Sequence, residues 1–224
     1  MMAVVKNTND PIMLQLRLSN FNVAYQGIPA IIDLSVTLTA ATVNLVTGVL
    51  GAGKTSLIRA ISGAIGHSGG MELREGISTY DQRSIIQPPP RRTLVSPHMN
   101  VTQFLQLGLM QHAWQRPPDT NERIRDALER CDLTSLAYSP LSSLTLTQMR
   151  LAETAQLFAQ QPRVILLDES SDRLAKTSEA SVLTCISKWV HETQSIALVA
   201  SESRTLPINV DRVLTLEGGR LLAA

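Results

Sequence analysis

A glycine-rich run at residues 48–55, GVLGAGKT, holds the side chains with the clearest capacity for chemistry. It satisfies the pattern G-x-x-x-x-G-K-[ST], in which glycines let backbone N–H groups converge on phosphate oxygens. The ammonium of Lys54 would reach the β and γ phosphates of a nucleotide, and the hydroxyl of Thr55 would bind Mg²⁺. The predicted nucleotide-binding residues here are Gly48, Gly51, Ala52, Gly53, Lys54 and Thr55 of this run and Ser56 directly after it.

An acidic pair after a second apolar run could complete such a site. Val164–Leu167 is apolar throughout, and Asp168 and Glu169 follow it directly. Asp168 would hold Mg²⁺ through water, and Glu169 would polarise the water that attacks the γ phosphate. Many buried strands end in an acidic turn, so this run alone is weak evidence for a nucleotide site. Its occurrence together with the glycine-rich run upstream makes the evidence stronger. The chemistry predicted is nucleotide hydrolysis.

The elements around the glycine-rich run have the pattern that a phosphate site needs. Val43–Thr47 is short, rich in β-branched residues and apolar, which is typical of a buried parallel strand, and Thr55–Ala64 has helical spacing. Upstream, the apolar runs at Met13–Leu18, Phe21–Tyr25 and Ile31–Thr37 predict an N-terminal antiparallel β layer.

Strands and helices alternate in the rest of the chain, and this favours a parallel sheet. Pro88–Arg92 has the sequence PPPRR and can only be a connector. The predicted fold is α/β in one domain over residues 1–224, a P-loop NTPase core with a mixed, mainly parallel sheet and an inserted helical subdomain at about 98–160. Helices are predicted at Val101–Gln111, Asn121–Cys131, Thr147–Gln160 and Ser178–Thr193, strands within Gly69–Gln87 and at Val164–Leu167 and Ser195–Ala200, and a closing hairpin at Asp211–Leu222.

Composition narrows the classes of function. A net charge of +1 with 17% charged residues gives no sign of the strongly basic surface that nucleic-acid binding requires. Cys131 and Cys185 lie far apart without a C-x-x-C motif, so they predict ordinary thiols of a reducing compartment and argue against metal binding. No apolar stretch reaches the roughly 18 residues of a spanning helix, and residues 1–11 lack the apolar core of a secretory signal. Any membrane role is therefore expected to go through a partner.

With these two motifs and a helical insertion between them, the sequence resembles the nucleotide-binding domain of ABC ATPases along nearly its whole length. The resemblance implies ATP and Mg²⁺ as ligands. Tyr25 stands where the family has an aromatic residue that stacks on adenine, although a buried core tyrosine is the alternative. Gln87 matches the Q-loop glutamine, which contacts Mg²⁺ and the attacking water. A solvent-facing glutamine before a turn is the alternative there, and Gln82 is another candidate.

The sequence departs from the family at three motifs. The signature LSGGQ falls on Leu144–Gln148, where both glycines are missing and bulky side chains impede a close approach to phosphate. A purely structural helix start, capped by Thr145 or Thr147, is an equal alternative. The D-loop aspartate falls on Ala175, and the switch histidine falls on Glu202, whose carboxylate would repel the γ phosphate.

The resemblance implies head-to-tail pairs in which each ATP lies between the phosphate loop of one domain and the signature of the other. We therefore predict ATP binding with only slow hydrolysis, since losing one transition-state donor costs about 100-fold to 1000-fold in rate. Lys54, Gln87 and Glu169 are the predicted catalytic residues, and Thr55, Gln87 and Asp168 the predicted metal ligands.

The favoured function is an ATP-binding subunit of an ABC transporter, or of an ABC-like membrane complex. The expected partners are a second nucleotide-binding domain and integral membrane subunits at the cytoplasmic face of a membrane, contacted through Gln87–Met99. The alternative is an ATP-binding pseudo-ATPase with a structural or regulatory role. A soluble ABC ATPase that acts on nucleic acid would need two fused domains or a basic face, and a small-molecule kinase would leave Gln87 unexplained.

Overall fold

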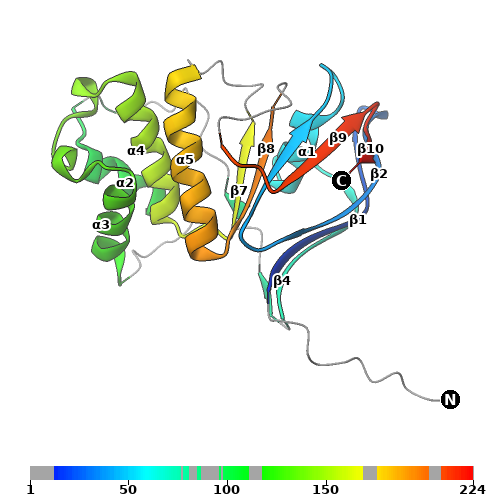
Figure 1. The fold of residues 1–224 in the computed structure, drawn as a ribbon, viewed down its shortest axis with the longest axis horizontal. Coiled ribbons are helices and arrows are strands. Elements are labelled where there is room, and N and C mark those ends of the chain that lie inside the picture. Colours follow the sequence, from blue (N-terminus) through cyan, green and yellow to red (C-terminus); the bar gives the residue numbers. More distant parts are fainter. Residues whose placement is uncertain are drawn as a thin grey trace.

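The computed structural model describes residues 13–76, 78–80, 85–86, 96, 98–110, 118–168, 176–201 and 208–223. These residues form two β-sheets with helices packed on them (Figure 1). The strands are β1 Leu14–Tyr25, β2 Ile28–Thr39, β3 Thr42–Thr47, β4 Ser68–Glu75, β5 Ser78–Tyr80, β6 Ile85–Ile86, β7 Val164–Asp168, β8 Ile196–Ala200, β9 Arg212–Glu217 and β10 Arg220–Ala223. The α-helices are α1 Lys54–Ile61, α2 Val101–Met110, α3 Thr120–Arg130, α4 Leu146–Ala159 and α5 Lys176–Thr193.

The first sheet is the predicted N-terminal antiparallel layer, with strand order β2-β1-β4-β5. One detail differs from the sequence-based prediction, because the two apolar runs before and after Asn20 are halves of a single strand, β1. Its register shifts between Leu18 and Phe21, and Asn20 has a φ of 46°. This irregularity changes the phase of the apolar alternation, so that both Leu18 and Phe21 face the core.

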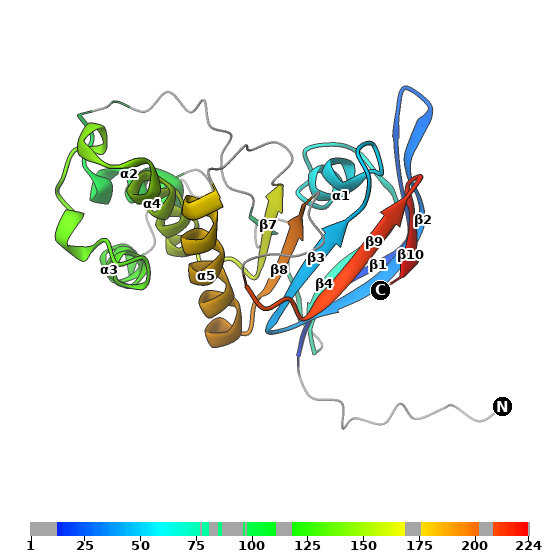
Figure 2. The same ribbon diagram turned by 45° about the horizontal axis from the view of Figure 1, so that its top comes forward.

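The second sheet has the order β10-β9-β3-β8-β7-β6. Five of its strands run parallel and β10 is antiparallel to β9, which makes the sheet mixed and mainly parallel as predicted. One face packs on α1 and on the antiparallel layer, and the opposite face packs on α5 and the other helices (Figure 2). Because both faces of β7 and β8 are covered, Val164–Leu167 and Ile196–Ala200 are apolar throughout. The third buried strand, β3, includes Asn44, whose Nδ2 donates a hydrogen bond of 3.1 Å to the carbonyl oxygen of Ala197.

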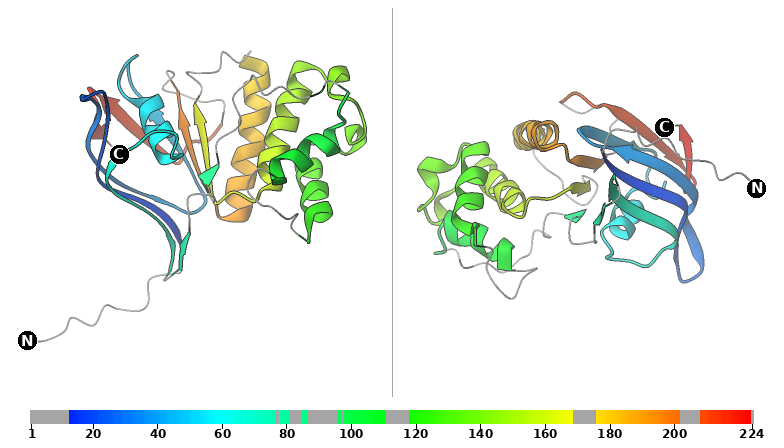
Figure 3. Two further views of the ribbon diagram at one scale, coloured as in Figure 1. Left: turned by 180° about the vertical axis from the view of Figure 1, so that it is seen from behind. Right: turned by 90° about the horizontal axis from the view of Figure 1, so that it is seen from below.

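Helices α2, α3 and α4 pack together at the end of the molecule away from the antiparallel sheet (Figure 3). Their contact is close at Gly108 in the middle of α2, where the Gln156 side chain of α4 lies against the helix. Gln156 is buried and its Nε2 donates a hydrogen bond of 2.6 Å to the carbonyl oxygen of Phe104. The boundaries of a helical subdomain at residues 98–160 stay a prediction.

Replacing Gly108 with Ala should destabilise the protein, although the same change in an open helix stabilises by about 1 kcal/mol. A Cβ at Gly108 would lie 2.5 Å from Cγ and 3.3 Å from the carbonyl oxygen of Gln156, whose side chain is held by its bond to α2. We expect the free energy of unfolding in urea to fall by about 1 to 3 kcal/mol. Gly66→Ala is the control, because a Cβ there meets nothing within 4 Å. Unchanged or higher stability in Gly108→Ala would contradict this packing.

The two cysteines are neighbours in the structure although they are distant in sequence. Cys131 follows the end of α3, Cys185 lies within α5, and their Sγ atoms are 3.4 Å apart in the interior. The hydrogen bond with Cys185, together with burial, raises the pKa of the Cys131 thiol. Within the described residues, no group of three or more His, Cys, Asp or Glu is arranged to hold a metal ion.

Candidate functional site

The glycine-rich loop lies at the carboxyl end of a central strand. β3 ends at Thr47 and α1 begins at Lys54, so the loop of six residues at 48–53 joins a buried parallel strand to a helix N-terminus. The first N–H groups of a helix have no intrahelical partner, and the helix dipole makes this end positive. The cap residue Gly53 supplies no side-chain hydrogen bond, and the first turn of α1 has no acidic residue. This end of α1 therefore suits a bound anion such as a phosphate group.

Two of the glycines are required by the packing of the loop. Gly48 has a φ of 154°, and a Cβ there would lie 2.3 Å from the carbonyl oxygen of Leu216 in β9. Gly53 has a φ of 104°, and its Cβ would lie 2.4 Å from the carbonyl oxygen of Ala30 in β2. Both positions therefore exclude a side chain, because fixed backbone atoms occupy the space that it needs.

The ammonium of Lys54 is held inside the loop. Its Nζ donates hydrogen bonds of 2.7 Å to the carbonyl oxygen of Gly48 and of 3.0 Å to that of Val49, and the residue is only 5% exposed. Hydrogen bonds from an ammonium are stronger than those between neutral groups. Lys54 is therefore oriented across the loop, where its charge can meet a phosphate.

Asp168 lies at the same edge of the sheet as the loop. It is the last residue of β7 and pairs in register with Ala200 of β8, which in turn pairs with Val46 near the end of β3. Neighbouring strands are about 4.8 Å apart, which places the Asp168 backbone about 10 Å from that of Val46. Asp168 is 9% exposed, and Thr55 follows Lys54 in the first turn of α1. A carboxylate and a hydroxyl at one edge are oxygen ligands of the kind that Mg²⁺ prefers.

Tyr25 lies at the tip of the hairpin between β1 and β2, where it pairs across the turn with Ile28. Its side chain is 41% exposed, so it is not the buried core tyrosine that was the alternative interpretation of the sequence. A role in stacking on adenine stays a prediction.

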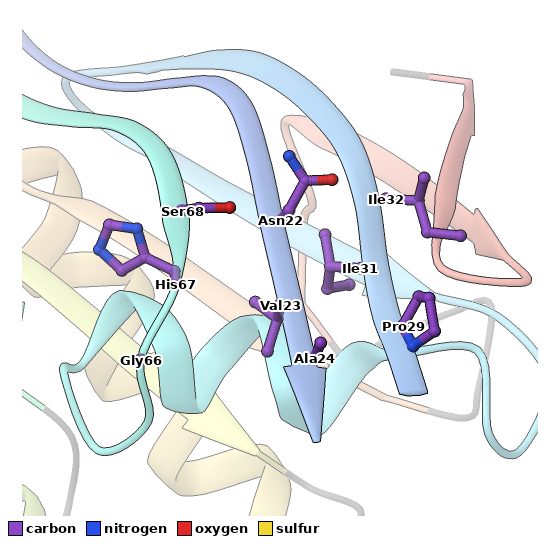
Figure 4. A pocket seen from close by; sticks show the side chains of 9 residues that line it. All are labelled: Asn22, Val23, Ala24, Pro29, Ile31, Ile32, Gly66, His67 and Ser68. Carbon is purple, nitrogen blue, oxygen red and sulfur yellow. The ribbon is translucent and has the colours of Figure 1, made fainter. Parts of the chain in front are cut away.

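A cavity of about 560 Å³ lies beside the same hairpin (Figure 4). Its polar lining includes Asn22 and His67, and its apolar wall includes Val23 and Ile31. His67 follows the C-terminal end of α1, the end that the helix dipole makes negative. His67 is therefore at the opposite end of the helix from the phosphate loop, whereas Ile31 lies against the N-cap residue Gly53, with its Cδ1 2.8 Å from where a Cβ of Gly53 would be.

The signature position has a self-contained helix start. Thr145 is the N-cap of α4, and its Oγ1 accepts a hydrogen bond of 3.2 Å from the backbone N–H of Gln148. In return, the Gln148 Oε1 accepts one of 2.9 Å from the backbone N–H of Thr145. Thr145 rather than Thr147 is thus the capping residue, and it completes a capping box.

Several predicted residues lie outside the described part of the chain. They are Gln82, Gln87, the connector 88–92, Glu169, Ala175 and Glu202. Their roles stay predictions from the sequence.

Sequence reasoning missed a contact of the loop with the C-terminal hairpin. The N–H of Gly219, in the turn between β9 and β10, donates a hydrogen bond of 3.2 Å to the carbonyl oxygen of Ala52. The glycine pair at 218–219 predicts a turn, but a turn motif carries no information about which distant segment the turn contacts.

A glycine-rich loop between a buried parallel strand and a helix, with an acidic strand end at the same edge, defines a nucleotide-binding protein of the P-loop class. The family model for ABC transporters matches residues 31–172, and the chain belongs to this family. The resemblance inferred from the motifs is thereby confirmed.

Relatives and solved structures agree with this assignment. The chain is 25% identical over 219 residues to the hemin import ATP-binding protein HmuV of Rhodococcus jostii, covering 93% of this chain and 73% of that protein. It is 27% identical over 222 residues to the Fe(3+) ions import ATP-binding protein FbpC of Pseudomonas fluorescens, covering 95% of this chain but only 61% of FbpC. The relatives are named as import ATP-binding proteins, which agrees with the predicted ATP-binding subunit of an ABC transporter.

Two solved structures confirm the predicted fold class. The ADP conformation of MJ1267, an ATP-binding cassette of an ABC transporter, has a TM-score of 0.80 at 18% identity and covers 94% of this chain and 90% of its own. The cbiO1 protein of Clostridium perfringens, part of the ABC transporter complex cbiONQ, has a TM-score of 0.77 at 21% identity, covering 96% and 88%. None of the described helices is long and apolar enough to cross a membrane.

Proposed function

We propose that this chain binds and slowly hydrolyses Mg-ATP as the nucleotide-binding subunit of an import ABC transporter. The observation that carries the proposal is the intact phosphate loop, with the Lys54 ammonium held inside it and Asp168 at the same sheet edge. The direction of transport rests on relatives whose names give import of hemin, Fe(3+) ions and 2-aminoethylphosphonate.

Each site residue has a distinct task in this proposal. Lys54 and the amides at the start of α1 bind the phosphates, and Tyr25 packs on the base. Thr55, Asp168 and Gln87 hold Mg²⁺, which would neutralise charge on the phosphates when bound. Glu169, next in sequence to the end of β7, accepts a proton from the attacking water.

The proposed partners are a second nucleotide-binding domain and integral membrane subunits, which place the chain at the cytoplasmic face of a membrane. A capped helix start without glycines at the signature position would give the partner domain's ATP little backbone contact. This supports slow turnover, and it favours a partner whose own sites differ from those of this chain.

A surface cavity beside α2 supports docking of a membrane subunit. It measures about 400 Å³, with His98 and Met99 on one side and Leu107 and Met110 of α2 on the other. His98 and Met99 are the last residues of Gln87–Met99, the segment predicted to contact the membrane subunits. Leu107 and Met110 are 36% and 53% exposed, so they form an accessible apolar side of a cavity whose other lining residues, Gln103 and Gln106 among them, are mostly polar. A cavity of this kind suits an apolar anchor from an amphipathic helix.

The proposal is tested by recovering the chain from membranes in mild detergent. We expect a membrane protein to co-purify with the unchanged chain, and its recovery to fall about tenfold or more in Met110→Glu, because a carboxylate cannot be buried in an apolar contact without a partner. Leu222→Glu is the control, since Leu222 is 61% exposed and lies on β10, whereas the cavity is lined by residues 96–110. Equal recovery with both variants would exclude α2 as the docking surface, and no co-purifying membrane protein would contradict the transporter proposal.

A further inference from the structure

The C-terminal hairpin reaches the phosphate loop through one residue of its turn. Gly219 lies between β9 and β10, and its N–H donates a hydrogen bond of 3.2 Å to the carbonyl oxygen of Ala52 in the loop. Its own carbonyl oxygen accepts a hydrogen bond of 2.8 Å from the N–H of Ile32 in β2. The backbone of Gly219 therefore links the loop to the antiparallel sheet, close to where β9, β10 and β2 lie side by side (Figures 1 and 2).

The three segments meet at a contact too tight for side chains. A Cβ at Gly219 would lie 2.7 Å from the carbonyl oxygen of Ala30, and a Cβ at Gly53 would lie 2.4 Å from the same oxygen. A Cβ at Gly48 would meet the Leu216 carbonyl oxygen in β9 at 2.3 Å. Loop, β2 and hairpin thus touch backbone to backbone, and a displacement of one must move the others.

The hydrogen bond from Gly219 also sets the direction of a phosphate-binding amide. It holds the carbonyl of Ala52, and in a planar trans peptide the following N–H points the opposite way. The N–H of Gly53, which belongs to the same peptide unit, is therefore directed away from the hairpin. Gly53 is the N-cap of α1, so this peptide plane leads into the amides at the start of the helix.

We propose that the turn of the C-terminal hairpin positions the phosphate loop for nucleotide, with Gly219 as the positioning residue. The inference rests on the proposed ATP binding and adds a second, distant segment to that site. The coupling between the turn and the loop is reciprocal. If the turn stabilises the nucleotide-binding form of the loop, then bound nucleotide must also stabilise the turn in its contact with the loop.

The chain offers a matched pair of variants for the test. Gly218 and Gly219 both have positive φ, 54° and 79°, so alanine is strained at either position. Only Gly219 has a backbone neighbour that a Cβ would strike, since nothing lies within 4 Å of a Cβ at Gly218. We expect the Kd for Mg-ATP, measured on folded protein with a fluorescent ATP analogue and competition by ATP, to rise about tenfold in Gly219→Ala and to stay within about twofold in Gly218→Ala.

Hydrogen exchange of the unchanged chain gives a second test that needs no variant to fold. Adding Mg-ATP should slow exchange in the peptides that contain Ile32 and Gly219 as well as in the one that contains residues 48–56. If Mg-ATP slows hydrogen exchange at residues 48–56 but not at the hairpin, the positioning role is overturned while ATP binding stands. Equal Kd values for the two glycine variants would have the same meaning. Absence of any protection by Mg-ATP would overturn both the inference and the proposed function.

Discussion

Replacing Glu169 with Gln should lower the rate of ATP hydrolysis by about 100-fold or more, because the amide cannot accept the proton of the attacking water. Binding of Mg-ATP should stay within a factor of about three, since Lys54 and the loop amides are untouched. The rate of hydrolysis is measured as the release of inorganic phosphate by the chain recovered together with its membrane partner. The affinity for Mg-ATP is measured by titration with a fluorescent ATP analogue.

The control for this change is Glu129→Gln on the exposed side of α3, which alters charge equally at a distance from the loop. Hydrolysis by this control should match that of the unchanged chain. If turnover is absent in the unchanged chain, or is the same in Glu169→Gln as in the unchanged chain, the protein is a nucleotide-bound structural or regulatory subunit instead of a motor.

The second large effect is expected from Lys54→Met, which keeps most of the length of the side chain and removes its charge. The Kd for Mg-ATP should rise about 100-fold, because charge-assisted hydrogen bonds to the phosphates are lost in a nearly buried position. Titration with a fluorescent ATP analogue measures the change, and circular dichroism checks that the variant is folded.

Lys188→Met is the matched control, since Lys188 lies exposed on α5 and makes the same change of charge. A Kd for Lys54→Met within about threefold of the unchanged value would show that the loop does not bind phosphate through this residue. The Lys54 and Glu169 variants together separate failure to bind ATP from failure to hydrolyse it.

Much of the fold was predictable because it depends on local patterns. The buried strand before the loop was predicted at Val43–Thr47 and is β3 at Thr42–Thr47, since a β-branched apolar run ended by glycine has few other conformations. The helix predicted from Thr147 begins one residue earlier, at Leu146, where the Thr145 cap and Gln148 form a capping box within four residues of sequence. The family resemblance came from the same kind of local motif.

Other features follow only from the order in which the strands pair. The sequence of the β7 strand shows that Asp168 ends it, but the strand order β3-β8-β7 is what brings Asp168 to the edge that carries the phosphate loop. Likewise, the packing of α3 beside α5 brings together Cys131 and Cys185, which the sequence indicated only as separate thiols.

The amino-acid sequence by itself determined the phosphate loop, the acidic strand end and most helix and strand positions, because glycine, β-branched and capping residues act on the backbone within a few residues of themselves. The tertiary structure alone decided that the Gly219 turn contacts Ala52 and that Ala30 leaves no room for a side chain at Gly53. Such contacts join segments far apart in the chain, and their geometry depends on the packing of both sheets at once.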